Sequence, residues 1–160
     1  MQGSGASSAS AQAAAVNTAA CTKRTPTLDL GEEDWARILD TNLTGTLRAC
    51  QVFGRHMLGR GSGRIVNIAS LASAVALLEV AAYNSSKAAV VALTKSLALE
   101  WGPRGVNVNA ISPGVFRTPL NQELLDGTER GRELVARTPL KRYGRMEELQ
   151  GACVLLASEA

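Results

Sequence analysis

The chain has 160 residues, of which 46% are hydrophobic and 4% aromatic, and its formal net charge is +3. This length suffices for one domain with a sizeable core, which Ala, Val and Leu must supply because aromatic residues are scarce. No stretch approaches the roughly 20 apolar residues that cross a bilayer, so no membrane association is expected. Basic and acidic residues alternate over 117–148 without aromatic interleaving, so nucleic acid is not an expected partner.

The cysteine and histidine content excludes two further classes of protein. Cys21, Cys50 and Cys153 are odd in number and widely spaced, which favours a reducing compartment, and therefore the cytoplasm, over a disulfide framework. A metal site is not expected, because the sequence has one histidine, His56, and no C-x-x-C pair.

The first residues differ in composition from the rest of the chain. Residues 1–15 consist almost entirely of Ala, Ser, Gly and Gln, and they lack the positive and apolar regions of a secretory signal. We therefore expect a disordered low-complexity tail over 1–15, followed by a domain over 16–160.

In chain order, the first predicted elements are a short strand over 13–17 and a loop over 22–30, in which Pro26 prevents a helix. A helix then opens with acidic residues over 31–34, which suit the helix dipole. Its apolar residues recur at helical spacing as far as about residue 57, with a break expected near 40–42.

The second half of the chain alternates between strand and helix patterns. The β-branched run over 64–68 predicts a buried parallel strand, and 83–101 predicts a helix. A second strand is predicted over 106–111 and a last helix over 147–158. Strands that alternate with helices in this way predict an α/β fold with a parallel sheet.

A small group of polar residues carries the chemistry. Tyr83 and Lys87 are four residues apart in Y-N-S-S-K, so a helix places both on one face. A lysine ammonium beside a phenol stabilises the phenolate, which suits a tyrosine to act as general acid or base on an alcohol or carbonyl oxygen. Ser70 ends the strand pattern G-R-I-V-N-I-A-S, at the edge where α/β sheets bind ligands, and it could hold the same oxygen.

This triple resembles the active site of the short-chain dehydrogenase/reductase family, and four other segments match that family in the same order. They are V-N-T-A-A (16–20), L-D-T-N-L-T-G (39–45), V-N-V-N-A-I-S-P-G-V-F-R-T (106–118) and R-Y-G-R-M-E-E-L-Q-G-A-C-V-L-L-A-S (142–158). The resemblance implies a Rossmann-type, doubly wound parallel sheet, of which the chain carries the C-terminal, catalytic portion.

The resemblance also implies roles for individual residues. The catalytic set would be Asn42, Ser70, Tyr83 and Lys87, with Asn42 binding a water that relays protons to the lysine. Lys87 would also hydrogen-bond the nicotinamide ribose. The cofactor NAD or NADP would be bound by Tyr83 and Lys87 together with these residues: Asn17, Pro113, Gly114, Phe116 and Thr118.

Several of these residues also have a purely structural interpretation. Ser70 could be a strand-end cap, and Ser73 is a rival for its role. Asn42 could bend or cap a helix. Thr118 could be a helix N-cap, with Pro119 in the first helical position.

The chain departs from the family pattern in its nucleotide-binding part. It contains no T-G-x-x-x-G-x-G phosphate loop, and Gly3-Ser4-Gly5 is no substitute because no β-α-β unit follows it. Thr18 and Ala20 replace an Asn and a Gly of the family's N-N-A-G segment, and the methyl group of Ala20 could crowd the cofactor. We therefore expect these 160 residues alone to bind NAD(P)H weakly or not at all.

The resemblance is strongest to gluconate 5-dehydrogenases and related sugar or sugar-acid dehydrogenases, so a small alcohol or ketone is the expected substrate. Ketoacyl reductases share much of the pattern and give an alternative substrate class. A second alternative is an inactive remnant or interaction module, and a third is that the missing half is encoded upstream. In the full-length family context, a homodimer or homotetramer is expected.

Overall fold

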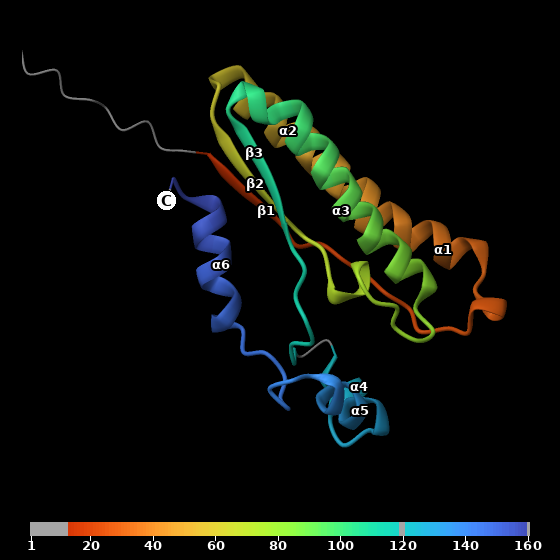
Figure 1. Cartoon of the computed structure of the whole chain (residues 1–160). Coiled ribbons are helices and arrows are strands. Elements are labelled where there is room, and N and C mark those ends of the chain that lie inside the picture. The colour runs from red at the N-terminus through yellow and green to blue at the C-terminus, as the bar shows by residue number, and fades with distance from the viewer. Residues whose placement is uncertain (1–12, 119–120, 160) are drawn as a thin grey trace, which may run out of the picture.

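A computed structural model describes residues 13–118 and 121–159. A parallel sheet of three strands in the order β1-β2-β3 lies at its centre, with β1 at Ala14–Asn17, β2 at Gly63–Ile68 and β3 at Val106–Ile111 (Figure 1). The register pairs Ala14 with Arg64 and Gly63 with Val106. All carboxyl ends of the strands therefore meet at one edge of the sheet.

Two long helices, α2 at Gly45–Arg60 and α3 at Ala81–Trp101, lie side by side along one face of the sheet. The helix α6 at Glu147–Ala157 contacts β2 and β3 from the other side (Figure 1). Helices on both faces of a parallel sheet confirm the predicted doubly wound α/β fold. Two short helices, α4 at Gln122–Leu125 and α5 at Glu129–Arg137, lie beyond the carboxyl ends of the strands.

The first helix of this layer changes its winding where the sequence predicted a break. α1 at Glu32–Leu39 continues without a chain reversal through a π-helical turn at Asp40–Thr44 into α2. The π turn carries Asn42, which is fully buried. A π turn inserts an extra residue into the helix, and such turns occur frequently at functional sites.

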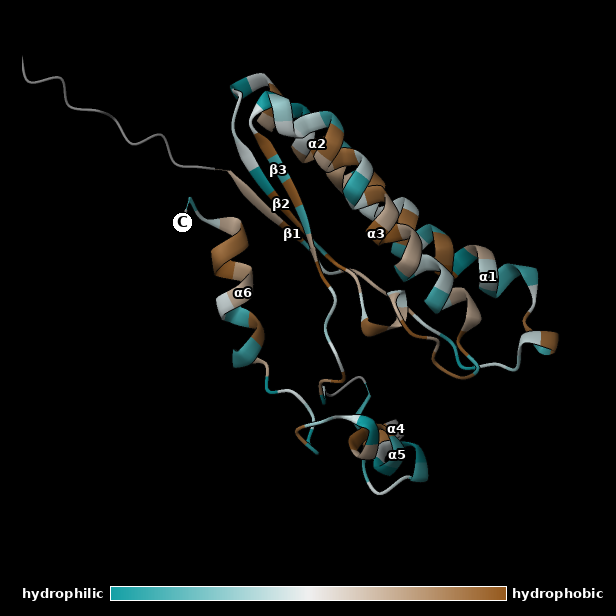
Figure 2. Ribbon diagram, in the orientation of Figure 1, coloured by the Kyte–Doolittle hydropathy of each residue, from teal (hydrophilic) through white to brown (hydrophobic). Residues whose placement is uncertain are grey.

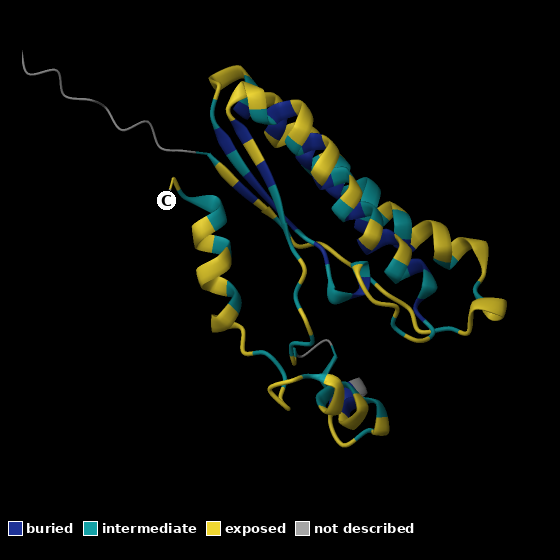
Figure 3. Cartoon of the chain, viewed as in Figure 1, coloured by how far each residue is buried: buried dark blue, intermediate teal, exposed yellow. Residues whose placement is uncertain are grey.

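The main core lies between the sheet and the pair α2 and α3. Figure 2 shows brown, hydrophobic segments on the strands and along both helices. Figure 3 shows the same layer as buried, whereas α6 has no buried residue. The core is formed by eight buried side chains: Ala15, Cys50, Met57, Ile65, Leu97, Trp101, Val106 and Val108.

A polar cluster also lies within this layer, between β1, β2 and the two long helices. The amide of Asn17 donates to Oδ1 of Asn67 over 2.7 Å, and Asn67 donates in turn to Oγ1 of Thr94 over 2.9 Å. The Cys50 thiol contacts Oδ1 of Asn67 at 3.5 Å, and burial raises the pKa of that thiol. Because each buried amide has a partner, the cluster joins strands and helices without an unpaired polar group.

The predicted elements agree with the structure, apart from their ends and the extent of the tail. The strand predicted over 106–111 has those bounds, and the helix predicted over 83–101 begins two residues earlier, at Ala81. The division of the chain at 15 and 16 is wrong, because β1 begins at Ala14 and pairs with β2 from there. The remainder of the predicted tail, 1–12, lies outside the described residues.

Several apolar side chains on α2 and α3 remain exposed on the side away from the sheet. Val52 is 63% exposed, Phe53 46% and Leu99 81%, and the small residues Ala88 and Ala92 are exposed as well. Small and apolar residues on neighbouring helices permit close packing across a two-fold axis. We therefore predict that the chain self-associates through α2 and α3.

Light scattering coupled to size exclusion measures this self-association. We expect a mass of at least twice 16.8 kDa, and a shift towards the monomer in a Phe53→Asp variant. Leu28→Asp, which changes a fully exposed leucine outside both helices, is the control and should leave the mass unchanged. Association that persists in Phe53→Asp would point instead to the edge of β1, and a wild-type monomer would contradict the prediction.

Candidate active site

The candidate site is a cavity of about 670 Å³ at the carboxyl ends of the strands. Ala69 and Ser70 follow β2, and Pro113 and Gly114 follow β3, so successive strand ends supply its wall. Parallel α/β sheets bind their ligands at this edge, because the loops that connect strands to helices converge there. The cavity is lined by Ser70, Tyr83 and Lys87 together, as the sequence predicted.

Helix α3 brings Tyr83 and Lys87 to the cavity from its first two turns. The Lys87 ammonium nitrogen lies 5.9 Å from the centroid of the Tyr83 ring, as the spacing of four residues predicted. Lys87 is 2% exposed, and its Nζ donates a hydrogen bond to the carbonyl oxygen of Ile68 over 2.6 Å. This bond fixes the ammonium between the end of β2 and the tyrosine ring.

Desolvation by burial lowers the pKa of Lys87 from its ordinary value of 10.5. Between the lowered pKa and about 10.5, the unfolded chain binds more protons than the folded chain, so the free energy of unfolding rises with pH in that window. We predict that Lys87→Met removes this rise, because methionine does not titrate.

Urea unfolding at a series of alkaline pH values measures the difference. Lys95→Met, which changes an exposed lysine on the same helix, is the matched control and should keep the wild-type rise. If the free energy of unfolding rose equally with pH in the wild type and in Lys87→Met, the result would contradict the burial of a charged ammonium at this site.

Ser70 lies two residues after the end of β2, where it caps the following turn and lines the cavity. Its Oγ accepts a hydrogen bond from the backbone N–H of Ala72 over 3.1 Å, in a capping box with Ser73. Ser70 lines the cavity, whereas Ser73 does not and instead donates to the carbonyl of Ser70. The hydroxyl proton of Ser70 has no part in the cap, so the geometry favours Ser70 over Ser73 as the group that holds a substrate oxygen.

Asn42 is fully buried and does not line the cavity. Its Oδ1 accepts from the N–H of Cys21 over 2.7 Å, and its Nδ2 donates to the carbonyl of Cys21 over 2.8 Å and to Oγ of Ser86 over 3.0 Å. Ser86 in turn donates to the carbonyl of Tyr83 over 2.8 Å. The Asn42 side chain therefore fixes the first turn of α3, which agrees with its structural interpretation, and the water-binding role stays a prediction.

Of the residues predicted to bind the cofactor, the four after β3 line the cavity: Pro113, Gly114, Phe116 and Thr118. Asn17 does not line it, since its side chain lies in the polar cluster with Asn67 and Cys50. Its neighbours Val16 and Thr18 line the cavity instead, because successive side chains of a strand point to opposite faces. The structure therefore places the Asn17 side chain outside the cavity lining, and its cofactor-binding role stays a prediction.

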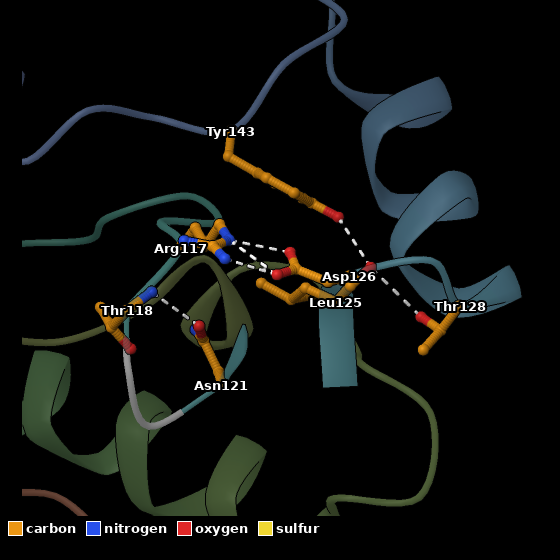
Figure 4. A network of polar contacts seen from close by, with 7 residues as sticks. All are labelled: Arg117, Thr118, Asn121, Leu125, Asp126, Thr128 and Tyr143. Carbon is orange, nitrogen blue, oxygen red and sulfur yellow. Dashed lines mark hydrogen bonds and ion pairs between the residues drawn. The ribbon is translucent and has the colours of Figure 1, made fainter. Parts of the chain in front are cut away.

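The segment after β3 is held by a polar network, which Figure 4 shows. Arg117 forms a bidentate ion pair with Asp126, with its Nε 2.8 and 3.1 Å from the two carboxylate oxygens. The N–H of Thr118 donates to Oδ1 of Asn121 over 2.8 Å, and Asn121 itself is the N-cap residue of α4. The predicted N-cap at Thr118 is therefore wrong, and Pro119 lies outside the described residues.

Sequence reasoning missed the opposite wall of the cavity. The missed lining residues that lie after Thr118 are Asn121, Leu125, Arg130, Leu134, Met146, Leu149, Gln150 and Cys153. They come from α4 and α5, which lie beyond the carboxyl ends of the strands, and from α6, which contacts β2 and β3, so only the folded chain brings them together. Ala20 also lines the cavity, so its methyl group forms part of the wall, where the family pattern has glycine.

The fold and this site define a Rossmann-type α/β domain, and comparisons with known proteins show its family. The sequence profile described as enoyl-(acyl carrier protein) reductase matches residues 10–160. The chain belongs to the short-chain dehydrogenase/reductase family. No described helix is long and apolar enough to cross a membrane.

Two of the similar relatives are a sugar-acid dehydrogenase and a polyol dehydrogenase. The chain is 42% identical over 145 residues to 2-dehydro-3-deoxy-D-gluconate 5-dehydrogenase of Bacillus subtilis, which covers 91% of this chain and 57% of the relative. It is 45% identical to D-threitol dehydrogenase of Mycolicibacterium smegmatis, with coverage of 91% and 55%.

The solved structure of a putative NAD(P)-dependent gluconate 5-dehydrogenase from Beutenbergia cavernae, with bound NADP, superposes with a TM-score of 0.89 at 42% identity. The superposition covers 92% of this chain and 59% of that structure. The chain thus spans a little more than half the length of the relatives that it matches.

Proposed function

We propose that this chain carries the catalytic part of an NAD(P)-dependent dehydrogenase that acts on the CH–OH group of a sugar, sugar acid or related alcohol, or reduces the corresponding ketone. The convergence of Ser70, Tyr83 and Lys87 on one cavity supports this proposal. The names of the relatives, which act on gluconate derivatives and on D-threitol, support the substrate class.

The residues of the cavity fit the nicotinamide end of such a cofactor. Pro113, Gly114 and Phe116 line the same cavity as Tyr83 and Lys87. A Cβ placed on Gly114 would meet nothing within 4 Å, so the backbone there is open to a ligand. When bound, the nicotinamide supplies or accepts the hydride. The choice between NAD and NADP stays open.

The side chains of this chain perform the proton chemistry. Tyr83 takes the proton of the alcohol during oxidation and returns it to the carbonyl oxygen during reduction. Ser70 donates a hydrogen bond to the same oxygen and orients it. The buried ammonium of Lys87, held by Ile68, stabilises the phenolate of Tyr83 by its positive charge.

Activity in a completed domain tests this function. The segment that precedes the matching region in the Bacillus subtilis relative is fused ahead of residue 13 of this chain, and the fusion is assayed with NAD and with NADP. We expect oxidation of gluconate or a polyol with one of the two cofactors. Turnover of 3-oxoacyl thioesters alone would favour the reductase alternative, and a folded fusion without any activity would favour an inactive remnant.

A further inference from the structure

We propose that Arg130 binds the carboxylate of an acidic substrate and thereby selects sugar acids over neutral polyols at the proposed active site. This inference rests on the proposed function, because it concerns a substrate held beside Tyr83. It names a specificity residue that lies in α5, outside every segment that carried the family resemblance.

Arg130 lies at the end of the cavity that Tyr83 forms. It lines the main cavity, a smaller adjoining pocket of about 490 Å³ and a third pocket of about 540 Å³, which Glu123, Glu129 and Glu133 also line. The residues common to the main cavity and the smaller adjoining pocket are Ala20, Leu77, Tyr83 and Arg130. Phe116 and Gly114, by contrast, line the main cavity and a different adjoining pocket. Arg130 and Tyr83 therefore line the same two pockets, whereas Gly114 and Phe116 of the proposed nicotinamide wall line a different adjoining pocket.

The charge of the cavity favours an anion. None of its described lining residues is Asp or Glu, and its cationic side chains are Lys87 and Arg130. The Lys87 ammonium is buried and bound to the carbonyl of Ile68. Arg24 in the adjoining pocket is paired with Glu79 at 2.5 Å.

Arg130 makes few polar contacts among the described residues. Its Nη1 makes one long contact of 3.4 Å, to the carbonyl oxygen of Leu78, and it forms no ion pair with a carboxylate. A guanidinium presents a planar fork of five N–H donors that matches both oxygens of a carboxylate. Most of that donor capacity is free to bind a ligand.

The backbone that carries Arg130 is held in place. Oγ1 of Thr128 accepts a hydrogen bond from the N–H of Gly131 over 2.9 Å, which caps the first turn of α5. A Cβ at Gly131 would lie 1.9 Å from the carbonyl oxygen of Leu125, so glycine permits this close contact. Figure 4 shows Tyr143 and Thr128 converging on the same Leu125 carbonyl. The first turn of α5 is therefore fixed over the cavity.

Two anions share the chemistry that Arg130 recognises: the substrate carboxylate and a phosphate of the nicotinamide nucleotide. The position of Arg130 beside Tyr83 favours the carboxylate, because the substrate oxygen must also reach that tyrosine. A change in affinity for the sugar acid identifies the first source, and a change in affinity for the nucleotide identifies the second.

Ligand binding to the 160-residue chain tests the inference without requiring activity. Gluconate and its uncharged counterpart glucitol are titrated and followed by ligand-observed NMR. We expect gluconate to bind roughly tenfold more tightly than glucitol, and the two affinities to become similar in Arg130→Met. Arg132→Met is the matched control, since Arg132 lies on the same helix, is exposed and does not line the cavity.

Kinetics of the fused enzyme separate this inference from the proposed function. Arg130→Met should raise KM for gluconate about tenfold while leaving KM for a neutral polyol and for the nucleotide unchanged. The fusion could be inactive while the 160-residue chain still binds gluconate more tightly than glucitol and loses that difference in Arg130→Met. That result would overturn the proposed function and leave the role of Arg130 intact. Equal binding of the two ligands to the wild type, absence of binding by both, or a change confined to the nucleotide overturns the role of Arg130.

Discussion

Tyr83→Phe is expected to lower the turnover of the fused enzyme by roughly a hundredfold or more, because it removes the hydroxyl that exchanges a proton with the substrate. The phenyl ring remains, so its contact with the Lys87 ammonium, 5.9 Å from the ring centroid in the wild type, is preserved. The loss should appear in kcat, with little change in the affinity for cofactor.

The matched control for this variant is Tyr143→Phe. Tyr143 does not line the cavity, and its hydroxyl donates a long hydrogen bond of 3.5 Å to the carbonyl of Leu125. Turnover of this control should stay within a few-fold of the wild type, and circular dichroism should show that both variants fold. If Tyr83→Phe kept wild-type turnover, another group would have to carry the proton.

Gly105→Ala is expected to destabilise the fold by about 3 kcal/mol or more, a large part of the stability of an ordinary domain. Gly105 has a φ of +81°, and a Cβ there would lie 2.0 Å from the carbonyl oxygen of Gly61. The contact is between two backbone segments, the turn before β3 and the turn after α2, so neither can move without disturbing the pairing of β2 with β3.

Thermal and urea unfolding measure this effect. Gly59→Ala is the control, because a Cβ at Gly59 meets nothing within 4 Å and the residue lies inside α2. Alanine there should stabilise the fold by about 0.5–1 kcal/mol through its better helix propensity. Equal stability of Gly105→Ala and the wild type would mean that the two turns do not lie in contact.

Local patterns in the sequence predicted the strands, the long helices and the spacing of the candidate catalytic residues. The β-branched run over 64–68 and the glycines around the strands mark elements whose hydrogen bonds and apolar faces are encoded by neighbouring residues. The spacing of Tyr83 and Lys87 is likewise local, since one helix fixes their relative position. These features follow from the period of a helix or a strand and need no knowledge of distant contacts.

The tertiary structure alone decided which side chains form the cavity. Asn17 has the sequence context of a cofactor residue, yet its partners Asn67 and Cys50 lie 50 and 33 residues away and hold its amide in the core. Arg130 has the sequence context of a solvated helix charge, yet α5 places it beside Tyr83. A side chain's role in a site depends on contacts between segments far apart in the chain, and the periodicity of a single segment does not specify those contacts.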